Sequence, residues 1–579
     1  MSGTSHAYLF EAKGIQRYIF DSGRLADVVG GSDLISGMCA SDEEDALVSL
    51  VGHVFKDQDG PDFSRRAGGA FCMHHADVSC LRRFQRLWRL WVGVNLPGLE
   101  FSDAVAENAA NPTHAYRKVS AVRENTAAFL PPAGHVYAAI NPRTGRTATE
   151  EIKEEIVDAV VAPQRRRAHA LAEEASVGAS PDRVADRFAG NSHPDDRPGL
   201  RLRFPRHFDA EEATQFSPAF PFKSVADGEE PDRRVALIHA DISGLGQVFT
   251  RLTAAVSSPA EVREVSNEIE NAIERAAQAA TRHVLLVETV TDPHEMAKRG
   301  LIGDADPAEL EHFALVPARP ILLGGDDIAI LVRADLALPF AKVLLSEIET
   351  RTRAAFDALR DQHPVLPPCL SACAGIAIVG AGHPFLAAHE LAEGLCSYAK
   401  KAAKQAAREG GERVPPSMLA FATVTSTVQE GWDTLHEREY SGAPDPTRTA
   451  AGDRLGALVY RVSDEAGHND RIDTLLELAR ALDALEGKGK LHQAIRWAFD
   501  EWTECEKAWN RFFEVAEGDA KTSAEAALAA LGARRRDHKD ARICPNAWSI
   551  ALVNDALELI DIGTDLAPRT EPETEGEGT

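Results

Sequence analysis

The sequence predicts an α+β fold with two related ferredoxin-like palm domains, followed by an α-helical C-terminal domain. Three observations favour this fold class. Short apolar strands alternate with helices whose apolar residues recur at helical spacing over residues 1–150 and 231–428. A Gly-Gly turn between two strand-like runs occurs twice, at residues 68–69 and 324–325. From about residue 430 onward, apolar residues recur at helical spacing.

The first palm domain is predicted over residues 1–150. Its expected elements are a strand at 7–10, helix at 14–38, a hairpin at 64–75, a helix at 81–94 and a strand running into a turn at 135–147. Residues 151–230 are expected to form a connector of helix and loop. Its basic run Arg165–Arg167 could touch phosphate, but a solvated helix face is the favoured interpretation.

The second palm domain is predicted over residues 231–428, with the most regular pattern in the chain. The expected order is β-α-α-β-β-α-β-α-β, with a strand at 234–241, two helices, a hairpin at 319–336, a helix at 338–359, a strand at 370–380, a helix at 383–407 and a strand at 417–424. Palm domains of polymerases and nucleotide cyclases share this plan. Helices are expected over 429–570, at 474–487, 491–513 and 523–536, before a disordered acidic tail at 571–579.

The two Gly-Gly hairpins indicate an internal repeat. The first reads Gly-Gly-Ala-Phe where the second reads Gly-Gly-Asp-Asp, within the same order of strand, helix, hairpin, helix and strand. We therefore expect two copies of one fold, of which only the second carries carboxylates.

Composition limits the function classes. The chain has 579 residues, too many for one compact core and suggestive of three or four domains. With 63 Lys+Arg against 89 Asp+Glu, its net charge is −26. Such acidity argues against a broad, non-specific coat on nucleic acid, whose phosphates attract Lys and Arg. It leaves open a local site that meets nucleotides through metal ions.

The eight cysteines are widely spaced and include no CxxC pair, so neither a disulfide framework nor a cysteine zinc ribbon is expected. The N-terminus lacks the basic and apolar regions of a secretory signal. The sequence contains no run of about 18 apolar residues, so no membrane span is expected. We expect a reduced, cytoplasmic protein.

Three aspartates carry the predicted chemistry. Asp241 ends one buried strand, and Asp326 and Asp327 lie in the second hairpin. Acids at the edges of apolar strands are costly unless something pairs them, and Mg²⁺ or Mn²⁺ prefers such oxygen ligands. Two such ions can clamp the attacking and leaving oxygens of phosphoryl transfer. The predicted catalytic residues are Asp241, Asp326 and Asp327, and the predicted metal-binding set adds Ile242.

Several neighbouring residues are predicted to bind nucleotide. The turn after Asp241 could cradle a triphosphate with backbone N–H groups, and the hairpin glycines allow close approach of backbone. Lys400, with Lys401 and Lys404, could neutralise phosphate charge. In the first palm, Gly30, Gly31 and Ser32 are candidate contacts for an acceptor nucleotide, but a helix-breaking turn is the favoured interpretation. The predicted nucleotide-binding residues are Ser243, Gly244, Gly246, Gly324, Gly325, Lys400, Gly31 and Ser32.

These motifs resemble a known family. The runs HADISGLG, LLGGDDIAILV and SACAGIAIVGAGHPFLAAHELAEGLCSYAK are similar to the second palm of the large, cyclase-bearing subunit of type III CRISPR effector complexes. FEAKGIQRYIFDSGRLADVVGGSDLI resembles that family's first palm. The resemblance covers about residues 1–140 and 230–425.

The resemblance implies a prokaryotic antiviral enzyme that polymerises ATP into cyclic oligoadenylates with two Mg²⁺ or Mn²⁺ ions. Asp241, Asp326 and Asp327 match the family's metal carboxylates, and Lys400 matches a lysine near the triphosphate. Implied partners are RNA or other subunits of a type III CRISPR-like complex, and a downstream effector that responds to the cyclic nucleotide.

The sequence departs from the family in two places. None of its 20 histidines is followed by Asp, so the HD nuclease motif that the family often carries is lacking. The stretch NPRTGRT occupies a place similar to the family's four-cysteine zinc site but contains no cysteine. We therefore expect a reduced form without DNA cleavage, and both a complex subunit and a stand-alone cyclase fit it.

Three other functions compete. In a diguanylate cyclase of the GGDEF class, Glu and Phe would complete the signature, but Ile328 follows Asp327 here. A non-catalytic scaffold that binds RNA through Arg165–Arg167 and Arg534–Arg536 stays open, although the intact aspartates argue against a vestigial site. A template-dependent polymerase is less favoured, because an acidic chain offers no obvious groove for a duplex.

Overall fold

The computed structural model describes most of the chain. The described residues are 5–39, 46–56, 59–67, 69–123, 139–176, 182–190, 201–224, 230–256, 258–307, 313–424, 431–440, 456–462, 470–532, 535–537, 540–543 and 547–564. The predicted tail at 571–579 lies outside them. The chain divides into two compact units, Met1–Arg333 with Phe340–Gly431, and Ala334–Pro339 with Trp432–Thr579. The finer domain boundaries stay predictions.

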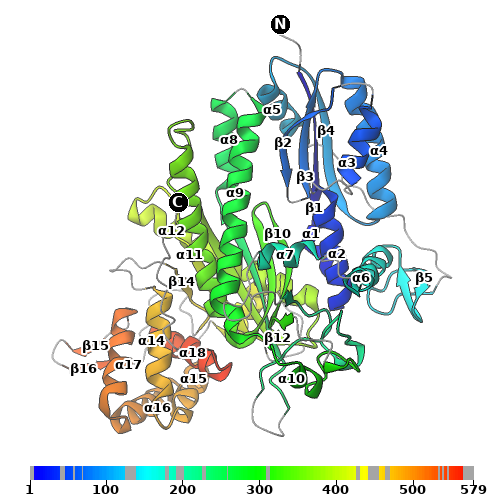
Figure 1. The fold of residues 1–579 in the computed structure, drawn as a ribbon. Coiled ribbons are helices and arrows are strands. Elements are labelled where there is room, and N and C mark those ends of the chain that lie inside the picture. Colours follow the sequence, from blue (N-terminus) through cyan, green and yellow to red (C-terminus); the bar gives the residue numbers. More distant parts are fainter. Residues whose placement is uncertain are drawn as a thin grey trace, which may run out of the picture. The chain divides into compact units, whose positions relative to one another are not determined.

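The first unit begins with a four-stranded antiparallel sheet (Figure 1). Its strands are β1 (Ser5–Lys13), β2 (Asp62–Ala67), β3 (Ala70–His75) and β4 (Glu100–Ala109), in the order β2-β3-β1-β4. This is the split order of a ferredoxin-like fold.

Helices cover both faces of this sheet, because alternate side chains of β1 point to opposite faces. Phe10 packs on Trp88 of α4 (Val78–Asn95), with 5.5 Å between ring centroids. Leu9 belongs to the core cluster that includes Val119 of α5 (Pro112–Arg123). The sheet is therefore buried on both sides.

The strand that closes the first sheet differs from the prediction. It is β4, directly after α4, whereas the sequence pattern favoured residues 135–147, of which 139–147 are described and form a turn. The apolar pattern of β4 is interrupted by Asp103, which is buried and accepts hydrogen bonds from Tyr8 Oη (3.1 Å) and Arg89 Nη2 (2.6 Å). A buried acid with partners far along the chain hides the strand signal.

Helices and a connector follow these strands. Between β1 and β2 lie α1 (Ile15–Phe20), α2 (Leu25–Met38) and α3 (Ala46–Val54). The helix predicted at 14–38 is therefore broken, with Gly23 at φ 66° in the break. The connector holds β5 (Ala148–Ile152), β6 (Glu155–Asp158), α6 (Val161–Ser176), α7 (Arg183–Ala189) and β7 (Arg201–Arg203), and β7 pairs with β9 (Phe313–Leu315).

The second sheet repeats the topology of the first. Within the first unit its strands are β8 (Arg234–Ser243), β10 (Ala318–Gly324), β11 (Asp327–Arg333), β12 (Ser371–Gly380) and β13 (Met418–Thr423), in the order β10-β11-β8-β12-β13. Hairpin, first strand and last strand are thus arranged as in β2-β3-β1-β4, and β13 is added in parallel to β12. The predicted α+β fold with two ferredoxin-like sheets is confirmed.

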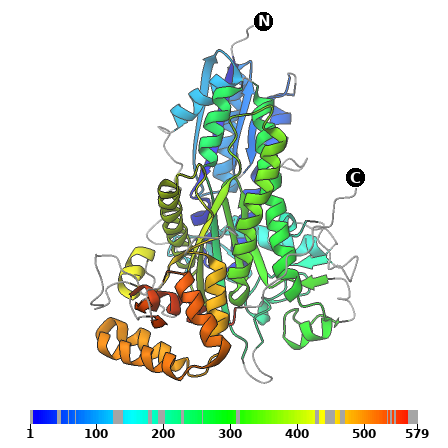
Figure 2. The same ribbon diagram turned by 90° about the vertical axis from the view of Figure 1, so that its left-hand side faces the viewer.

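Long helices accompany the second sheet. They are α8 (Leu245–Ala255), α9 (Pro259–Ala280), α11 (Ala334–Leu359) and α12 (Phe385–Gly410), with the short α10 (Pro293–Lys298) between α9 and β9. The green helices α8 and α9 lie beside the blue first sheet in Figure 1, and Figure 2 shows the same ribbon turned by 90°. Helix α9 packs against β2, and α8 against α5, so the two sheets share helical contacts.

A glycine lets α12 lie directly on the second sheet. A Cβ built on Gly375 in β12 would be 2.0 Å from the carbonyl oxygen of Ala392 and 2.4 Å from the backbone nitrogen of Cys396. Both atoms belong to the backbone of α12, which cannot give way as a flexible side chain can. Only glycine permits this approach.

The second unit is mainly helical. Its helices are α13 (Trp432–Glu439), α14 (Ile472–Asp483), α15 (Gly489–Asp500), α16 (Trp502–Val515), α17 (Gly518–Ala530) and α18 (Ala547–Asp561), with short strands β14 (Val459–Arg461), β15 (Arg535–Asp537) and β16 (Asp540–Ile543). The predicted single helix at 491–513 is divided at Glu501, whose φ is −138°. Helices α15 and α16 pack on each other, so folding back lets both bury their apolar faces.

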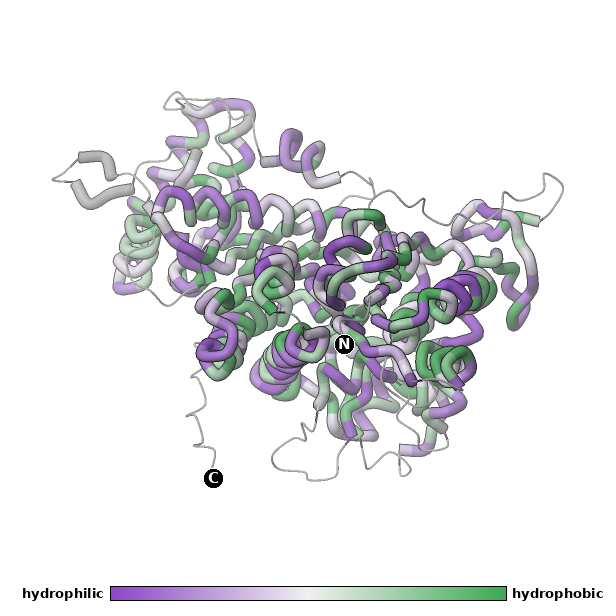
Figure 3. Tube along the Cα trace, turned by 90° about the horizontal axis from the view of Figure 1, so that it is seen from above, coloured by the Kyte–Doolittle hydropathy of each residue, from purple (hydrophilic) through white to green (hydrophobic). Residues whose placement is uncertain are grey.

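Hydropathy along the chain agrees with this packing. The helices alternate purple and green along their turns in Figure 3, as expected when one face is buried. None of the described helices is long and apolar enough to cross a membrane. The described cysteines are all buried and free of disulfides.

Replacing Gly375 with alanine should destabilise the first unit strongly. The new methyl group would force α12 off β12, at a cost of about 3 kcal/mol or more, the upper end for overpacking. Urea unfolding measures the loss. Gly380→Ala in the same strand is the matched control, because a Cβ there meets nothing within 4 Å. Equal stability of the two variants would contradict the packing argument.

Candidate active site

The hairpin between β10 and β11 brings the three predicted aspartates together. Asp327 lies directly opposite Asp241 in the antiparallel register of β11 and β8. The N–H of Ile242 donates to the carbonyl oxygen of Asp326 at 2.9 Å. Gly325 begins the turn with φ 65°, a conformation that favours glycine. Because two buried strands end here side by side, all three carboxylates share one edge of the sheet.

Lys400 of α12 balances part of this charge. Its Nζ forms an ion pair with Oδ1 of Asp241, and the two side chains are 26% and 21% exposed. The close approach at Gly375 carries α12, and Lys400 with it, to this edge of the sheet. Lys401 and Lys404 are exposed on the same helix.

The site raises the pKa values of Asp241 and Asp327. Burial raises the pKa of Asp327 to about 6, the charges of Asp326 and Asp241 add to the rise, and Gln16 and Lys400 oppose it. Burial also raises the pKa of Asp241, against the hydrogen bond and charge of Lys400. For Lys400, burial lowers the pKa, but the hydrogen bond and charge of Asp241 outweigh it and leave the pKa raised. The carboxylates repel each other where burial limits screening by water. A bound cation would relieve this repulsion.

The donor set suits a hard divalent cation, although it is not assembled as a metal centre. Carboxylate oxygens are the ligands that Mg²⁺ and Mn²⁺ prefer. Among the described residues, no three His, Cys, Asp or Glu side chains are grouped so that they could hold a metal ion together. Lys400 and Gln16 instead hold Asp241 and Asp327. Ile242 is buried, so only its backbone carbonyl could reach an ion.

The turn after β8 lies where the sequence predicted it. Ser243 ends β8, Gly244 has φ 81° and precedes α8, and Gly246 lies in the first turn of that helix. A Cβ on Gly244 or Gly246 would meet nothing within 4 Å, so this backbone faces open space. A helix begins here a few residues from Asp241, as a triphosphate-binding role would require.

The first-palm candidates Gly31 and Ser32 lie elsewhere than expected. They sit inside α2, so the favoured interpretation of a helix-breaking turn is wrong, and they are buried. Ser32 Oγ donates to the carbonyl oxygen of Ile321 in β10. A Cβ on neighbouring Gly30 would be 2.0 Å from the carbonyl oxygen of Gln164 in α6. These residues pack helices against each other and present no exposed face to a nucleotide.

The structure adds residues beside the hairpin that the sequence did not indicate. Gln16 Nε2 of α1 donates to Oδ2 of Asp327 at 2.7 Å. Arg187 of α7 donates to the carbonyl oxygen of Leu323 at 2.6 Å and pairs with Glu270 and Glu274 of α9. A pocket next to the hairpin is lined by Arg65, Arg187, Leu245, Phe249, Ser266, Ile269, Glu270, Ile273, Leu323, Gly324 and Gly325.

The basic run of α6 is occupied by ion pairs. Arg165 is buried and pairs with Asp27 and with Glu155, at 2.7 Å for the latter. Arg167 pairs with Asp33 at 2.6 Å, and Arg166 pairs with Glu150 at 2.6 Å. Arg165 is buried, so the interpretation of this run as a solvated helix face is wrong for that residue. All three arginines form ion pairs with acids of their own unit. Arg534 lies outside the described residues.

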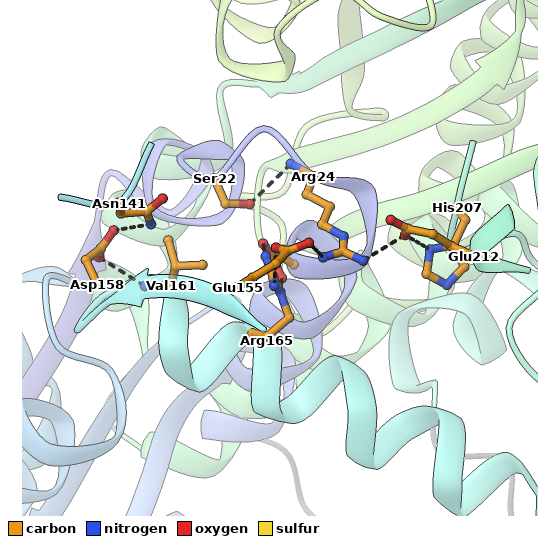
Figure 4. Close-up of polar contacts among 10 residues, drawn as sticks. Ser22, Arg24, Asn141, Glu155, Asp158, Val161, Arg165, His207 and Glu212 are labelled. Carbon is orange, nitrogen blue, oxygen red and sulfur yellow. Dashed lines mark hydrogen bonds and ion pairs between the residues drawn. The ribbon is translucent and has the colours of Figure 1, made fainter. Parts of the chain in front are cut away.

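Figure 4 shows how the pairs of Arg165 and of Arg24 join the connector to the first palm. Arg24 donates to Glu155 at 2.9 Å and to Glu212 at 2.7 Å, and Glu212 also contacts His207 at 2.9 Å. In the NPRTGRT turn, Asn141 donates to Asp158 at 2.8 Å. Hydrogen bonds to the buried carboxylate of Asp158 close this turn.

Comparisons with known proteins agree with the motifs. Residues 234–408 match the family model of the Cas10/Cmr2 second palm domain. The resemblance inferred from the sequence is thereby confirmed for that segment, which has a fold of the nucleotide cyclase type. No curated protein matches the chain.

Several solved structures show similarity to this chain. A Csm1–Csm4 cassette in complex with cA3 is 12% identical, over 97% of this chain and 70% of that chain, with a TM-score of 0.46. A Csm1–Csm4 cassette in complex with one ATP is 13% identical, over 96% and 70%, with a TM-score of 0.45. Csm1 of T. onnurineus is 10% identical, over 96% and 70%, with a TM-score of 0.42.

Replacing Asp327 with asparagine should stabilise the metal-free protein above pH 6. The folded-state pKa of about 6 exceeds the ordinary value of 3.8, so the folded state binds more protons between these values. Stability therefore falls as pH rises from about 4 to 6, by roughly 1–2 kcal/mol after allowance for solvent screening. The variant should lose this decline.

Denaturant unfolding in EDTA at a series of pH values from 4 to 8 measures the free energy of unfolding of both proteins and shows whether it falls with rising pH as expected. Asp361→Asn, at an exposed position, serves as the control and should keep the wild-type profile. If Asp327→Asn has the same pH profile as the wild type, the charge repulsion inferred at the hairpin is wrong.

Proposed function

We propose that this protein, which carries a Cas10/Cmr2 second palm domain, is a nucleotidyltransferase that condenses ATP into cyclic oligoadenylates. The observation that carries the proposal is the register of β8 and β11, with Asp241 opposite Asp327 and Asp326 in the adjoining turn. Acids grouped in this way oppose a polyanionic substrate on their own and favour it once divalent cations lie between them. The family of the matched segment supports ATP as the substrate.

The residues at and near the hairpin have different proposed roles. Asp241, Asp326 and Asp327, with the carbonyl of Ile242, would hold two Mg²⁺ or Mn²⁺ ions, which when bound neutralise phosphate charge and make a hydroxyl easier to deprotonate. Gly324 and Gly325 keep side chains out of the way of the nucleotide. Lys400 has a long flexible chain, so it can exchange Asp241 for a phosphate oxygen.

The proposed reaction is an in-line displacement. The 3′-hydroxyl oxygen of one nucleotide bonds to the α-phosphorus of another, the bond from that phosphorus to the β-phosphate oxygen breaks, and pyrophosphate leaves. The hydroxyl proton passes to solvent. Repetition lengthens the chain. Attack by the terminal 3′-hydroxyl on the α-phosphorus of the first nucleotide breaks the bond to its β-phosphate oxygen, releases the last pyrophosphate and closes the ring. The protein contributes positioning and charge compensation.

The biological setting is proposed from the same family. The protein would act in prokaryotic antiviral defence, with RNA or other subunits of a type III CRISPR-like complex and a downstream effector as partners. Two observations argue against the alternative that the protein is a non-catalytic, RNA-binding scaffold. Arg165–Arg167 are paired with acids of their own unit, which leaves fewer of their charges for RNA, and Asp241 lies opposite Asp327 in the sheet, which supports the catalytic proposal.

Incubation of the pure chain with ATP and Mn²⁺ should give cyclic oligoadenylates, identified by mass spectrometry. GTP, offered separately, should give little product. The double variant Asp326→Asn with Asp327→Asn should lose synthesis by at least about 100-fold, because two cation ligands are removed while side-chain size is kept. Each reaction is run with and without added RNA.

Asp361→Asn is the matched control and should retain full synthesis. Persistent synthesis in the double variant would refute the assigned residues. A cyclic product made from GTP alone would favour the diguanylate cyclase alternative, and absence of any product with either nucleotide and added RNA would favour the scaffold.

A further inference from the structure

The first palm reaches the carboxylates of the second through one side chain. Gln16 lies in α1, directly after β1, and its Nε2 donates to Oδ2 of Asp327 at 2.7 Å. The two residues are 311 positions apart. Both are partly buried, so the hydrogen bond is sheltered from water. The described residues give the second oxygen of Asp327, Oδ1, no hydrogen bond.

An amide donor differs from the lysine on the neighbouring aspartate. Lys400 brings a full positive charge to Asp241 and so takes the place of a cation. The Gln16 amide is neutral, so it fixes one oxygen of Asp327 without cancelling the negative charge. A carboxylate held in this way keeps its other oxygen for a metal ion, as carboxylate ligands in metal sites commonly do.

The helix that carries Gln16 is itself held firmly. Phe20 at its end stacks on His389 of α12, with 4.8 Å between ring centroids, and on Phe385 at 6.3 Å. Gln164 of α6 donates to the carbonyl oxygen of Tyr18 at 2.8 Å. Helix α1 thus rests on α12, the helix that supplies Lys400. Packing of α1 therefore sets the position of Gln16 relative to Asp327.

We propose that Gln16 is a positioning residue, by which the first palm orients Asp327 for a divalent cation. This inference rests on the proposed function, since it assumes that the aspartates bind Mg²⁺ or Mn²⁺. It gives the first palm a direct part in the site, although its own hairpin reads Gly-Gly-Ala-Phe and carries no acid. Any displacement of α1 would alter cation affinity at the hairpin.

Binding of Mn²⁺ to the full-length protein, followed by electron paramagnetic resonance without nucleotide, tests the proposal. Gln16→Met removes the amide at nearly constant size, and the dissociation constant for Mn²⁺ should rise about 10-fold, the lower end for loss of an outer-sphere partner. Gln16→Asn keeps the amide on a shorter chain and should give a smaller rise. Thermal unfolding in EDTA should be unchanged in both.

Gln405→Met is the matched control, because Gln405 also donates to a carboxylate, Glu409 at 2.9 Å, on an exposed part of α12. It should bind Mn²⁺ as the wild type does. If Gln16→Met also binds as tightly as the wild type, while Asp326→Asn with Asp327→Asn loses binding, the role of Gln16 is refuted and the cation site stands. If wild type and the double aspartate variant bind alike, both proposals fail. Should Gln16→Met not fold, Gln16→Asn decides by the same criterion.

Discussion

The antiparallel pairing of β8 with β11 is the constraint around which the site is organised. Register alone places Asp241 opposite Asp327, and the two-residue turn adds Asp326. Strand ends that are otherwise apolar thus gather negative charge, and the partial burial of Asp241 and Asp327 limits how well water screens it. The surrounding elements compensate for this charge in different ways: α12 supplies a cation through Lys400, and α1 supplies a neutral donor through Gln16.

Close backbone approach, more than side-chain chemistry, decides which elements can take part. Gly375 admits α12 to the sheet, and Gly30 admits α6 to α2, each with room for no Cβ. Arg187 then secures the strand before the hairpin by binding the carbonyl oxygen of Leu323. Because packed interiors do not deform continuously, these contacts fix the functional side chains within a narrow range of positions.

The two palms share a topology but contribute differently. The second provides the carboxylates, whereas the first provides packing surfaces and one side chain at the hairpin. Gly31 and Ser32, which looked like nucleotide contacts, are buried between α2, α6 and β10. Gln16, which no motif marked, lies at Asp327. A repeat whose own hairpin lacks acids can therefore still contact the acidic hairpin of the other repeat.

The sequence by itself determined the repeated α+β plan, the hairpin and its three aspartates, because periodicity and turn chemistry are local signals. It did not reveal β4, in which buried Asp103 interrupts the pattern, nor the division of the helix at Glu501, which serves packing. Only the tertiary structure joined Gln16 to Asp327 and Arg187 to Leu323. Such contacts link residues far apart in the chain, and packing of whole elements, rather than any local preference, decides which of them meet.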